Sequence, residues 1–421
     1  MNDVASLPPL GAFAACGIEL EYMIVDRDTL GVLPVADRLL QRAAGAATPV
    51  DEVARGRFAW SNELVLHLVE VKNARPDADV AQLAAGFQAE VGAIDRLLAD
   101  FDARLMPTAT HPWMDPAHEL HLWPHQHADI YMSYHHIFDC RQHGWANLQS
   151  VHVNLPFADD AEFVRLHAAL RLLLPLLPAL AASSPVADGE RKPVLDFRMA
   201  CYCQHPRRVP ALIGQVVPDD TAGRADYEAR VLAPMYHDIA PFDPDGVLRH
   251  EWLNTRGVMP RFDRNALEVR VIDVQECPQA DLAIAAITVA AARALYEERW
   301  SPLAAQRAMD TGALFHLLQG TIHDADRHVI DDAAYLGLFG MAAGPCEAGA
   351  LWRHLLDACG DDPALSPIAA DTLQFILDRG PLARRIVAAL GGRIDRVRLQ
   401  AMYRRLCDCL AAGELFAGAA S

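Results

Sequence analysis

The sequence is poor in lysine, and this shortage excludes one large group of nucleotide-binding sites. Only two of its 37 basic residues are lysines, Lys72 and Lys192, and the others are arginines. A P-loop requires a lysine that follows a glycine and precedes a serine or threonine, and neither lysine has these neighbours. Any nucleotide bound by this protein must therefore be held by arginine side chains, by metal ions or by both.

Positive charge is also scarce relative to negative charge. The chain has 55 acidic residues against 37 basic ones, which gives a formal net charge of -18. Proteins that bind duplex nucleic acid need a basic surface to meet the phosphates. The charge balance therefore argues against a nucleic acid partner, whereas small anionic substrates are compatible with it where cations are supplied locally.

Paired cysteines and long apolar runs are absent as well. The nine cysteines include no CxxC pair, so we expect reduced thiols rather than a zinc cage or a disulfide framework. The first residues lack the basic and apolar regions of a secretory signal. The longest apolar runs, Leu172–Ala182 and Leu282–Ala292, are too short to cross a bilayer. We therefore expect a cytoplasmic protein without a membrane partner.

What is present is enough apolar material for a large core, since 52% of the 421 residues are hydrophobic and 22% are charged. Alternating apolar residues predict strands at Gly17–Val25, Glu63–Val71, Val151–Leu155 and Ala266–Val274. Apolar residues spaced by three and four predict helices at Val80–Phe101, Asp160–Ala182, Asp281–Trp300 and Pro381–Ala412. Because strands and helices do not alternate regularly, we expect an α+β fold with an antiparallel sheet backed by helices.

Two of the predicted strands carry acidic residues in unusual positions. In Gly17–Val25, the period of two puts Glu19 and Glu21 on one face, although an ordinary solvated strand face is the simpler interpretation of this motif alone. Glu70 lies inside an apolar run, where a carboxylate is costly unless it is paired or bound to a metal. Glu63 precedes Glu70 by an odd number of residues, so a bulge or turn must intervene if both serve one site.

The other two strands add a histidine and an arginine. His152 and Asn154 share one face, and a neutral imidazole that faces carboxylates can bind a metal, although a hydrogen-bonded core histidine explains this motif equally well. Glu268 and Arg270 share a face. Phosphoryl transfer needs such a pair side by side, because the carboxylate can bind a cation and the guanidinium can bind a phosphate. A simple ion pair would explain these two residues, but not the other three motifs.

Together these motifs resemble the glutamate–cysteine ligases and related carboxylate–amine ligases, which are similar in fold to glutamine synthetase. The resemblance covers about residues 15–295. It rests on Gly-x-Glu-x-Glu from Gly17, Val-His-Val-Asn from Val151, the segment Ala182–Val186 followed by Phe197–Met199, and Leu267–Val274. The resemblance implies a curved antiparallel sheet that forms a funnel, a catalytic domain over residues 1–300, and a helical region over residues 301–421 packed on it.

The resemblance also implies roles for particular residues. The metal ligands would be Glu19, Glu21, Glu63, Glu70, His152 and Glu268. Arg270 matches the arginine that contacts the transferred phosphoryl group, and Arg198 resembles a second arginine near phosphate or substrate. Arg261 and Arg256 precede the last strand and are further candidates for nucleotide binding.

The implied activity uses ATP, glutamate, and cysteine or another amine, with two or three Mg²⁺ or Mn²⁺ ions. ATP would phosphorylate the glutamate side chain, and the amine would then attack the acyl phosphate. Carboxylates that converge in one funnel repel each other by about 4 kcal/mol per pair at about 4 Å and an effective dielectric of about 20, so divalent cations are almost required. Oxygen ligands with a single imidazole suit Mg²⁺ or Mn²⁺ better than zinc. A homo-oligomer is compatible with this interpretation.

A zinc hydrolase is the main alternative. The segment His111–His143 holds eight of the 18 histidines. However, His118-Glu119-Leu120-His121 does not have the HExxH spacing, and Pro116 and Pro124 would interrupt a helix. A non-catalytic or phosphotransfer relative of the same fold is a further alternative.

Overall fold

The computed structural model describes residues 9–342, 344–392 and 394–418, and its centre is an antiparallel sheet of eight strands in this part of the chain. The strands are β1 (Gly17–Asp26), β2 (Glu52–Arg55), β3 (Phe58–Asn62), β4 (Leu68–Asn73), β5 (Ala103–Met106), β6 (Ser150–Pro156), β9 (Val258–Arg261) and β10 (Ala266–Asp273). Their order is β2-β3-β4-β1-β6-β10-β9, and β5 pairs with β1. The predicted α+β class with an antiparallel sheet is confirmed.

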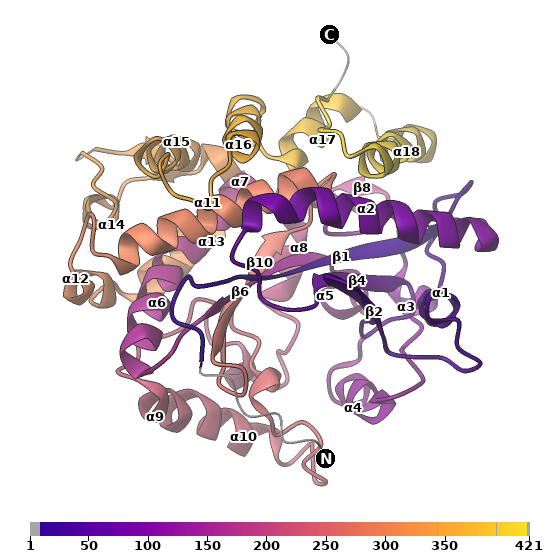
Figure 1. Cartoon of the computed structure of the whole chain (residues 1–421), viewed down its shortest axis with the longest axis horizontal. Helices are drawn as coiled ribbons and strands as arrows, with labels where there is room; N and C mark the ends of the chain where they lie inside the picture. Colours follow the sequence, from indigo (N-terminus) through magenta and orange to yellow (C-terminus); the bar gives the residue numbers. More distant parts are fainter. Residues whose placement is uncertain (1–8, 343, 393, 419–421) are drawn as a thin grey trace.

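Helices surround this sheet and continue to the end of the described chain (Figure 1). The main ones are α1 (Ala36–Ala44), α2 (Val80–Leu98), α4 (Ala128–Phe138), α5 (His143–Ala146), α6 (Asp160–Leu173), α7 (Leu177–Ala181), α8 (Phe197–Tyr202), α10 (Ala233–Ile239), α11 (Pro278–Tyr296), α13 (Thr311–Asp324), α14 (Ala333–Gly337), α15 (Ala348–Ala358), α16 (Pro367–Arg379), α17 (Leu382–Leu390) and α18 (Arg396–Ala412). Helix α11 packs against α2, α6 and α16. Helices α2, α6, α11 and α16 therefore form one layer over one face of the sheet. Helices α4, α5 and α8 lie on the other side, where their residues line a cavity.

The alternation in β1 explains why one face of the sheet is apolar and the other is charged. Ile18, Leu20 and Tyr22 are fully buried in the main hydrophobic cluster, which also contains the apolar residues of α2 and α11. Glu19 and Glu21 point to the opposite face because successive side chains alternate along a strand. The site described below lies on this second face.

Two helical segments are long and apolar enough to cross a membrane by length and composition alone. They are Asp160–Ala181 and Pro278–Tyr296, but 94% and 83% of the apolar 18-residue window within each are buried inside the fold. Pro175 and Pro178 divide the first segment into α6, a short 3₁₀ turn and α7, because proline lacks the N–H that a continuous helix needs. Both segments are therefore core helices here.

The C-terminal helices pack directly on the sheet and its helical layer. Helix α16 contacts α11, and α18 contacts β5 and α2. The prediction of a single helix over Pro381–Ala412 is wrong, because α17 ends at Gly391, whose φ of 66° lies in the left-handed region that glycine adopts readily. A new helix then starts after Asp395, whose side chain accepts a hydrogen bond from the Arg398 N–H. The domain division at residue 300 stays a prediction.

The predicted strand Glu63–Val71 is wrong over its first half. Strand β3 ends at Asn62 and β4 begins only at Leu68, so Glu63 lies in the connection between them. Within this connection, Leu66 donates its N–H to the carbonyl of His121, and His67 accepts from the N–H of Ile24. This break releases Glu63 from the alternation of β4, as its odd spacing from Glu70 required.

Candidate functional site

Four adjacent strands bring acidic side chains together on the face of the sheet that the helical layer leaves open. The antiparallel register pairs Glu21 with Glu70 and Glu19 with His152. Glu268 of β10 lies opposite Asn154, two residues after His152 on β6. Residues that face each other across strands have Cβ atoms about 5 Å apart, so this register alone concentrates the charges.

Two groups of these side chains have the geometry of metal ligands. In Glu19, Glu70 and His152, one ligand atom of each residue lies within 4.8 Å of the others, and the same holds for Glu21, Glu63 and Glu70. Glu70 belongs to both groups. The donors are carboxylate oxygens with a single imidazole nitrogen, so the set suits Mg²⁺ or Mn²⁺ better than zinc.

His152 lies at the centre of this acidic cluster. Its Nδ1 is 2.9 Å from Glu19 Oε2, and its Nε2 is 3.0 Å from the hydroxyl oxygen of Ser150. Burial alone would lower the pKa of His152, but the hydrogen bond to Glu19 and the charges of Glu21 and Glu268 raise it to about 9. Without a metal, a protonated imidazole therefore holds the carboxylates together.

For two carboxylates of the cluster, Glu63 and Glu21, the negatively charged form is unfavourable in the folded protein. Burial, with the negative charges of Glu21 and Glu70, holds the pKa of Glu63 well above its usual range. Burial also raises the pKa of Glu21, although Ser150 donates both its N–H and its hydroxyl to Glu21 Oε2, at 2.7 and 2.9 Å. A divalent cation would relieve both effects, because it compensates the charge that burial makes costly.

Arg270 and Arg261 border the cluster beside Glu268. The Nε of Arg270 is 2.9 Å from Glu268 Oε1, and Nη1 of Arg261 is 3.5 Å from Glu268 Oε2. Nη1 of Arg270 also lies 3.5 Å from the carbonyl oxygen of Asn254, while its Nη2 has no hydrogen-bond partner within the described ranges. Arg270 therefore keeps one terminal nitrogen available for a ligand.

Arg198 of α8 is buried directly behind Arg270. Its Nε donates to Asp273 Oδ1 at 2.5 Å, and its two terminal nitrogens donate to the carbonyl oxygen of Arg270 at 3.3 and 3.4 Å. Asp273 in turn accepts from the N–H of Ser183 and the hydroxyl of Ser184. The sequence motifs contain both serines and Asp273, but only the tertiary structure reveals that they fix Arg198.

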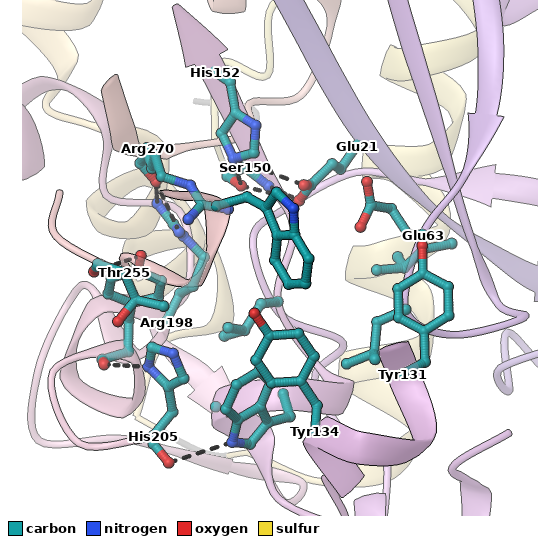
Figure 2. Close-up of a pocket in the computed structure, with 17 residues that line it drawn as sticks. Glu21, Glu63, Tyr131, Tyr134, Ser150, His152, Arg198, His205, Thr255 and Arg270 are labelled. Atoms are coloured by element: carbon teal, nitrogen blue, oxygen red, sulfur yellow. Dashed lines mark hydrogen bonds and ion pairs between the residues drawn. The ribbon is translucent and has the colours of Figure 1, made fainter. Parts of the chain in front are cut away.

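A cavity of about 240 Å³ opens on the Glu21 side of the cluster. Figure 2 shows Glu21, Glu63 and His152 near one end of it, with Arg198 and Arg270 along one side. The aromatic residues of its lining were not predicted from the sequence; they are Tyr131, Tyr134, Trp145, Tyr202 and Trp252. They come from separate segments of the chain, and only the spacing of Tyr131 and Tyr134 on one helix hinted at a shared face.

A second cavity of about 340 Å³ lies on the Glu19 side, where its lining includes the basic residues Lys72, Arg75 and Arg264. Lys72 Nζ is 2.9 Å from Glu70 Oε1, so this cavity also borders the acidic cluster. Arg256 lines neither of the two cavities, because its guanidinium donates to the Ala211 carbonyl and to Asn254. The acidic cluster thus separates two cavities that differ in their lining.

The histidines of the segment His111–His143 do not gather around a common centre. His118 pairs with Asp115, His125 with Asp37 and His143 with Asp188, while His111 Nε2 lies 2.7 Å from the Leu30 carbonyl oxygen. Neither metal-ligand group found among the described residues includes any of them. The zinc alternative therefore lacks a set of ligands in this part of the chain.

This α+β fold, with an acidic cluster between two cavities on an antiparallel sheet, belongs to the glutamine synthetase-like class. The chain is a member of glutamate–cysteine ligase family 2, whose sequence profile matches residues 15–336. The resemblance to glutamate–cysteine ligases seen in the motifs is thereby confirmed.

Two individual relatives each match about two thirds of this chain. An uncharacterised protein of Archaeoglobus fulgidus is 34% identical over 283 residues, which are 67% of this chain and 75% of that protein. A protein of Ectopseudomonas mendocina, provisionally named glutamate–cysteine ligase 2, is 28% identical over 275 residues, 64% of this chain and 63% of its own length. This chain therefore spans less than two thirds of that named relative.

The structural comparison supports the fold at low sequence identity. A glutamate–cysteine ligase of Francisella tularensis, solved in complex with AMP, superposes with a TM-score of 0.58 at 12% identity. The match covers 93% of this chain and 88% of that protein.

Proposed function

We propose that this protein is an ATP-dependent carboxylate–amine ligase that forms a γ-glutamyl amide from glutamate and an amine. The main support for this proposal is the acidic cluster between two cavities, with the available guanidinium nitrogen of Arg270 at its edge. A reaction between ATP and a carboxylate needs cations where two anionic reactants meet. Membership of glutamate–cysteine ligase family 2 supports the same reaction class.

The donor set is suited to divalent cations. Glu19, Glu70 and His152 would hold one ion, and Glu21 and Glu63 would share Glu70 to hold another. Glu268 lies close enough to His152, at 3.9 Å, to complete the cluster. Bound Mg²⁺ or Mn²⁺ would supply positive charge that neutralises phosphate oxygens.

The two cavities suit the two kinds of substrate. The cavity with Lys72, Arg75 and Arg264 would take ATP, because arginine and lysine can bind phosphates without a P-loop. The cavity with Arg198 and Arg270 would take glutamate and the amine. The γ-phosphate of ATP and the side chain of glutamate would then meet at the acidic cluster.

The chemistry follows from these positions in two steps. An oxygen of the glutamate γ-carboxylate attacks the γ-phosphorus of ATP, and ADP leaves. Arg270 stabilises the negative charge on the transferring phosphoryl group. The amine nitrogen then attacks the carbonyl carbon of the acyl phosphate, and phosphate leaves. No nucleophile from the protein is needed.

Isotope transfer tests this mechanism directly. Glutamate labelled with ¹⁸O in its γ-carboxylate is incubated with the protein, ATP, Mg²⁺ and a panel of amines. We expect a γ-glutamyl amide by mass spectrometry, one ADP per amide, and ¹⁸O in the released phosphate, because the carboxylate oxygen leaves with the phosphoryl group. Amide formation without ¹⁸O in phosphate would refute the acyl phosphate, and no ADP with any amine would refute the ligase. The cytoplasmic location and a homo-oligomer stay predictions.

A further inference from the structure

The cavity of about 240 Å³ has an aromatic wall that the proposed reaction with cysteine leaves unexplained. Aromatic residues make up five of its 17 lining residues but only 7% of the whole chain. Tyr134 is central, since its ring centroid lies 5.2 Å from that of Trp145 and 6.2 Å from that of Trp252. Figure 2 places Tyr131 across the cavity from Arg198 and Arg270. Such a wall favours a ligand with a planar or apolar body.

The rings of this wall are held in place by their own neighbours. Trp145 stacks on Phe138 with centroids 5.3 Å apart, and its Nε1 donates to the carbonyl oxygen of His205 at 3.3 Å. Trp252 stacks on His250, also at 5.3 Å. The surface is therefore preorganised, so a ring that stacks on it needs little rearrangement of the protein.

The cations of the cavity are too few for two amino acid substrates. Its lining includes two guanidinium groups, those of Arg198 and Arg270, and the charge of Arg198 is already balanced by Asp273. In the proposed reaction, Arg270 binds the phosphoryl group, and the remaining N–H groups of Arg198 are left for the α-carboxylate of glutamate. An α-amino acid as the amine substrate would bring a third anionic group.

The histidines of the cavity do not supply the missing charge. Nδ1 of His205 lies 2.6 Å from the Tyr202 carbonyl oxygen, and burial lowers the pKa of His205 to about 4, so it is neutral near pH 7. His152 is enclosed by Glu19, Glu21 and Glu268. A second carboxylate in this cavity would therefore be buried without a cationic side chain to pair with, because the proposed divalent ions are taken up by the acidic cluster and the phosphates, and this burial is unfavourable.

We infer that the amine substrate is a primary amine with an aromatic or other planar apolar body and no carboxylate, rather than cysteine or another α-amino acid. This inference rests on the proposed function. The amine nitrogen forms a bond to the γ-carbonyl carbon while the bond between that carbon and the phosphate oxygen breaks. The ammonium loses two protons in total, one to the leaving phosphate and one to solvent.

Four amines in two matched pairs separate the two features of the inference. Phenethylamine and phenylalanine differ only in the carboxylate, and so do cysteamine and cysteine. With ATP, Mg²⁺ and glutamate, we expect each carboxylate-free amine to exceed its partner in kcat/KM by at least about tenfold, and phenethylamine to exceed cysteamine. Equal or better turnover of cysteine or phenylalanine would overturn the inference while leaving the ligase activity standing.

A binding measurement keeps the inference testable if no amine is turned over. Calorimetric titration of the protein with phenethylamine and phenylalanine, in the presence of ADP and Mg²⁺, requires no chemistry. We expect phenethylamine to bind at least about tenfold more tightly, and equal affinities or no binding of either amine would overturn the inference. Failure of the ligase activity alone, with this difference in affinity retained, would instead count against the proposed function.

A variant of the aromatic wall gives an independent measurement. Trp252→Ala removes a half-buried ring from the wall, and we expect it to raise KM for phenethylamine by about tenfold while KM for cysteamine changes little. Tyr236→Ala is the matched control, because Tyr236 is also half-buried but lines neither cavity. Equal effects of Trp252→Ala on the two amines would show that the wall does not recognise the ring.

Discussion

At the scale of single residues, the proposed mechanism demands most of Arg270, because its guanidinium would serve two purposes at once. Its Nε stays 2.9 Å from Glu268 while a terminal nitrogen remains available. A lysine has one charged nitrogen and cannot contact Glu268 and a phosphoryl group from two directions. In the proposed mechanism, the charge of Arg270 therefore matters less than the shape of its guanidinium.

We expect Arg270→Lys to lower kcat for amide formation by at least about a hundredfold, with a smaller change in KM for ATP and little change in melting temperature. Initial rates and a thermal melt would measure these effects. Arg299→Lys, at an exposed position, is the control and should retain full activity. Turnover close to wild type in Arg270→Lys would remove Arg270 from the mechanism.

His167 is a second residue with a measurable consequence, although it lies outside the site. It is buried beside Phe163 and Tyr227, and its Nε2 has no hydrogen-bond partner among the described residues. Burial, with the nearby charge of Arg171, lowers the pKa of His167 from 6.5 to about 3. Below about pH 6.5, His167 is therefore protonated in the unfolded chain but stays neutral in the folded chain. The free energy of unfolding consequently falls as the pH decreases.

We expect His167→Phe to remove this penalty. The free energy of unfolding of the variant minus that of wild type should be larger, in the stabilising direction, by about 2 kcal/mol at pH 5 than at pH 7. Urea unfolding at both pH values measures the difference. His237→Phe is the control, because His237 is exposed on α10, and it should show no such pH dependence. An identical effect of His167→Phe at both pH values would contradict the argument.

Many residues of the candidate site could be predicted from the sequence because strand alternation is a local property. Glu19, Glu21, Glu70, His152 and Glu268 were each placed on a face by their own strand, and the structure brings these faces together. Asp273 was not recognised as the partner of Arg198, because 75 residues separate the two in the sequence. Their contact depends on how α8 packs behind β10, which no local pattern contains.

At the scale of elements, the approach of β9 and β10 to the helical layer depends on Gly257. A Cβ atom at this position would lie 2.6 Å from Val271 Cγ1 and 2.7 Å from Leu174 Cδ1. The carbonyl of Gly257 accepts from the N–H of Arg270, and its own N–H donates to the Val216 carbonyl. The close packing of this glycine therefore helps to set the backbone position of Arg270.

We expect Gly257→Ala to cost about 1–3 kcal/mol of unfolding free energy, because the added methyl group overpacks a buried contact. It should also lower kcat through displacement of Arg270, which a combined denaturation and rate measurement would detect. Gly337→Ala in helix α14 is the matched control, since a Cβ atom there would meet no atom of the described residues within 4 Å. An unchanged melting temperature in Gly257→Ala would show that the neighbours yield easily.

The strands also show where the periodicity of apolar residues is insufficient to predict the bounds of an element. The strands β1, β6 and β10 agree with their predicted ranges within one or two residues. Apolar and polar residues alternate through β6, through the first half of β1 and through most of β10, and this pattern is strong enough to mark each strand. The apolar run from Glu63 also suggested one strand, but the chain turns before Leu68 through hydrogen bonds to His121 and Ile24. Contacts with distant segments therefore overrode a local preference.

At the scale of the whole molecule, the net charge of -18 and the acidic cluster imply that cations stabilise the fold. We expect Mg²⁺ or Mn²⁺ to increase the free energy of unfolding by about 2.7 kcal/mol at a hundredfold excess over the dissociation constant. The melting temperature should rise accordingly. ATP with Mg²⁺ should raise it further, whereas NaCl at equal ionic strength should do little. Thermal melts across millimolar concentrations test this.

Two variants separate site binding from general charge effects. Glu268→Gln should weaken the response of the melting temperature to Mg²⁺, because it removes a charge beside His152 and Arg270. Asp331→Asn, at an exposed position outside the cluster, should leave the response intact. If both variants respond as wild type does, the acidic cluster is not where the cation binds.

The sequence by itself determined which side chains this protein can offer to the proposed chemistry. Strand periodicity fixed which carboxylates share a face, and the shortage of lysine left arginine and metal ions for phosphate binding. Only the tertiary structure decided that Glu63 joins the cluster, that Asp273 holds Arg198, and that aromatic rings form one wall of the cavity. The physical reason is that alternation is encoded between neighbouring residues, whereas a cavity is formed by side chains whose segments meet only when the chain folds.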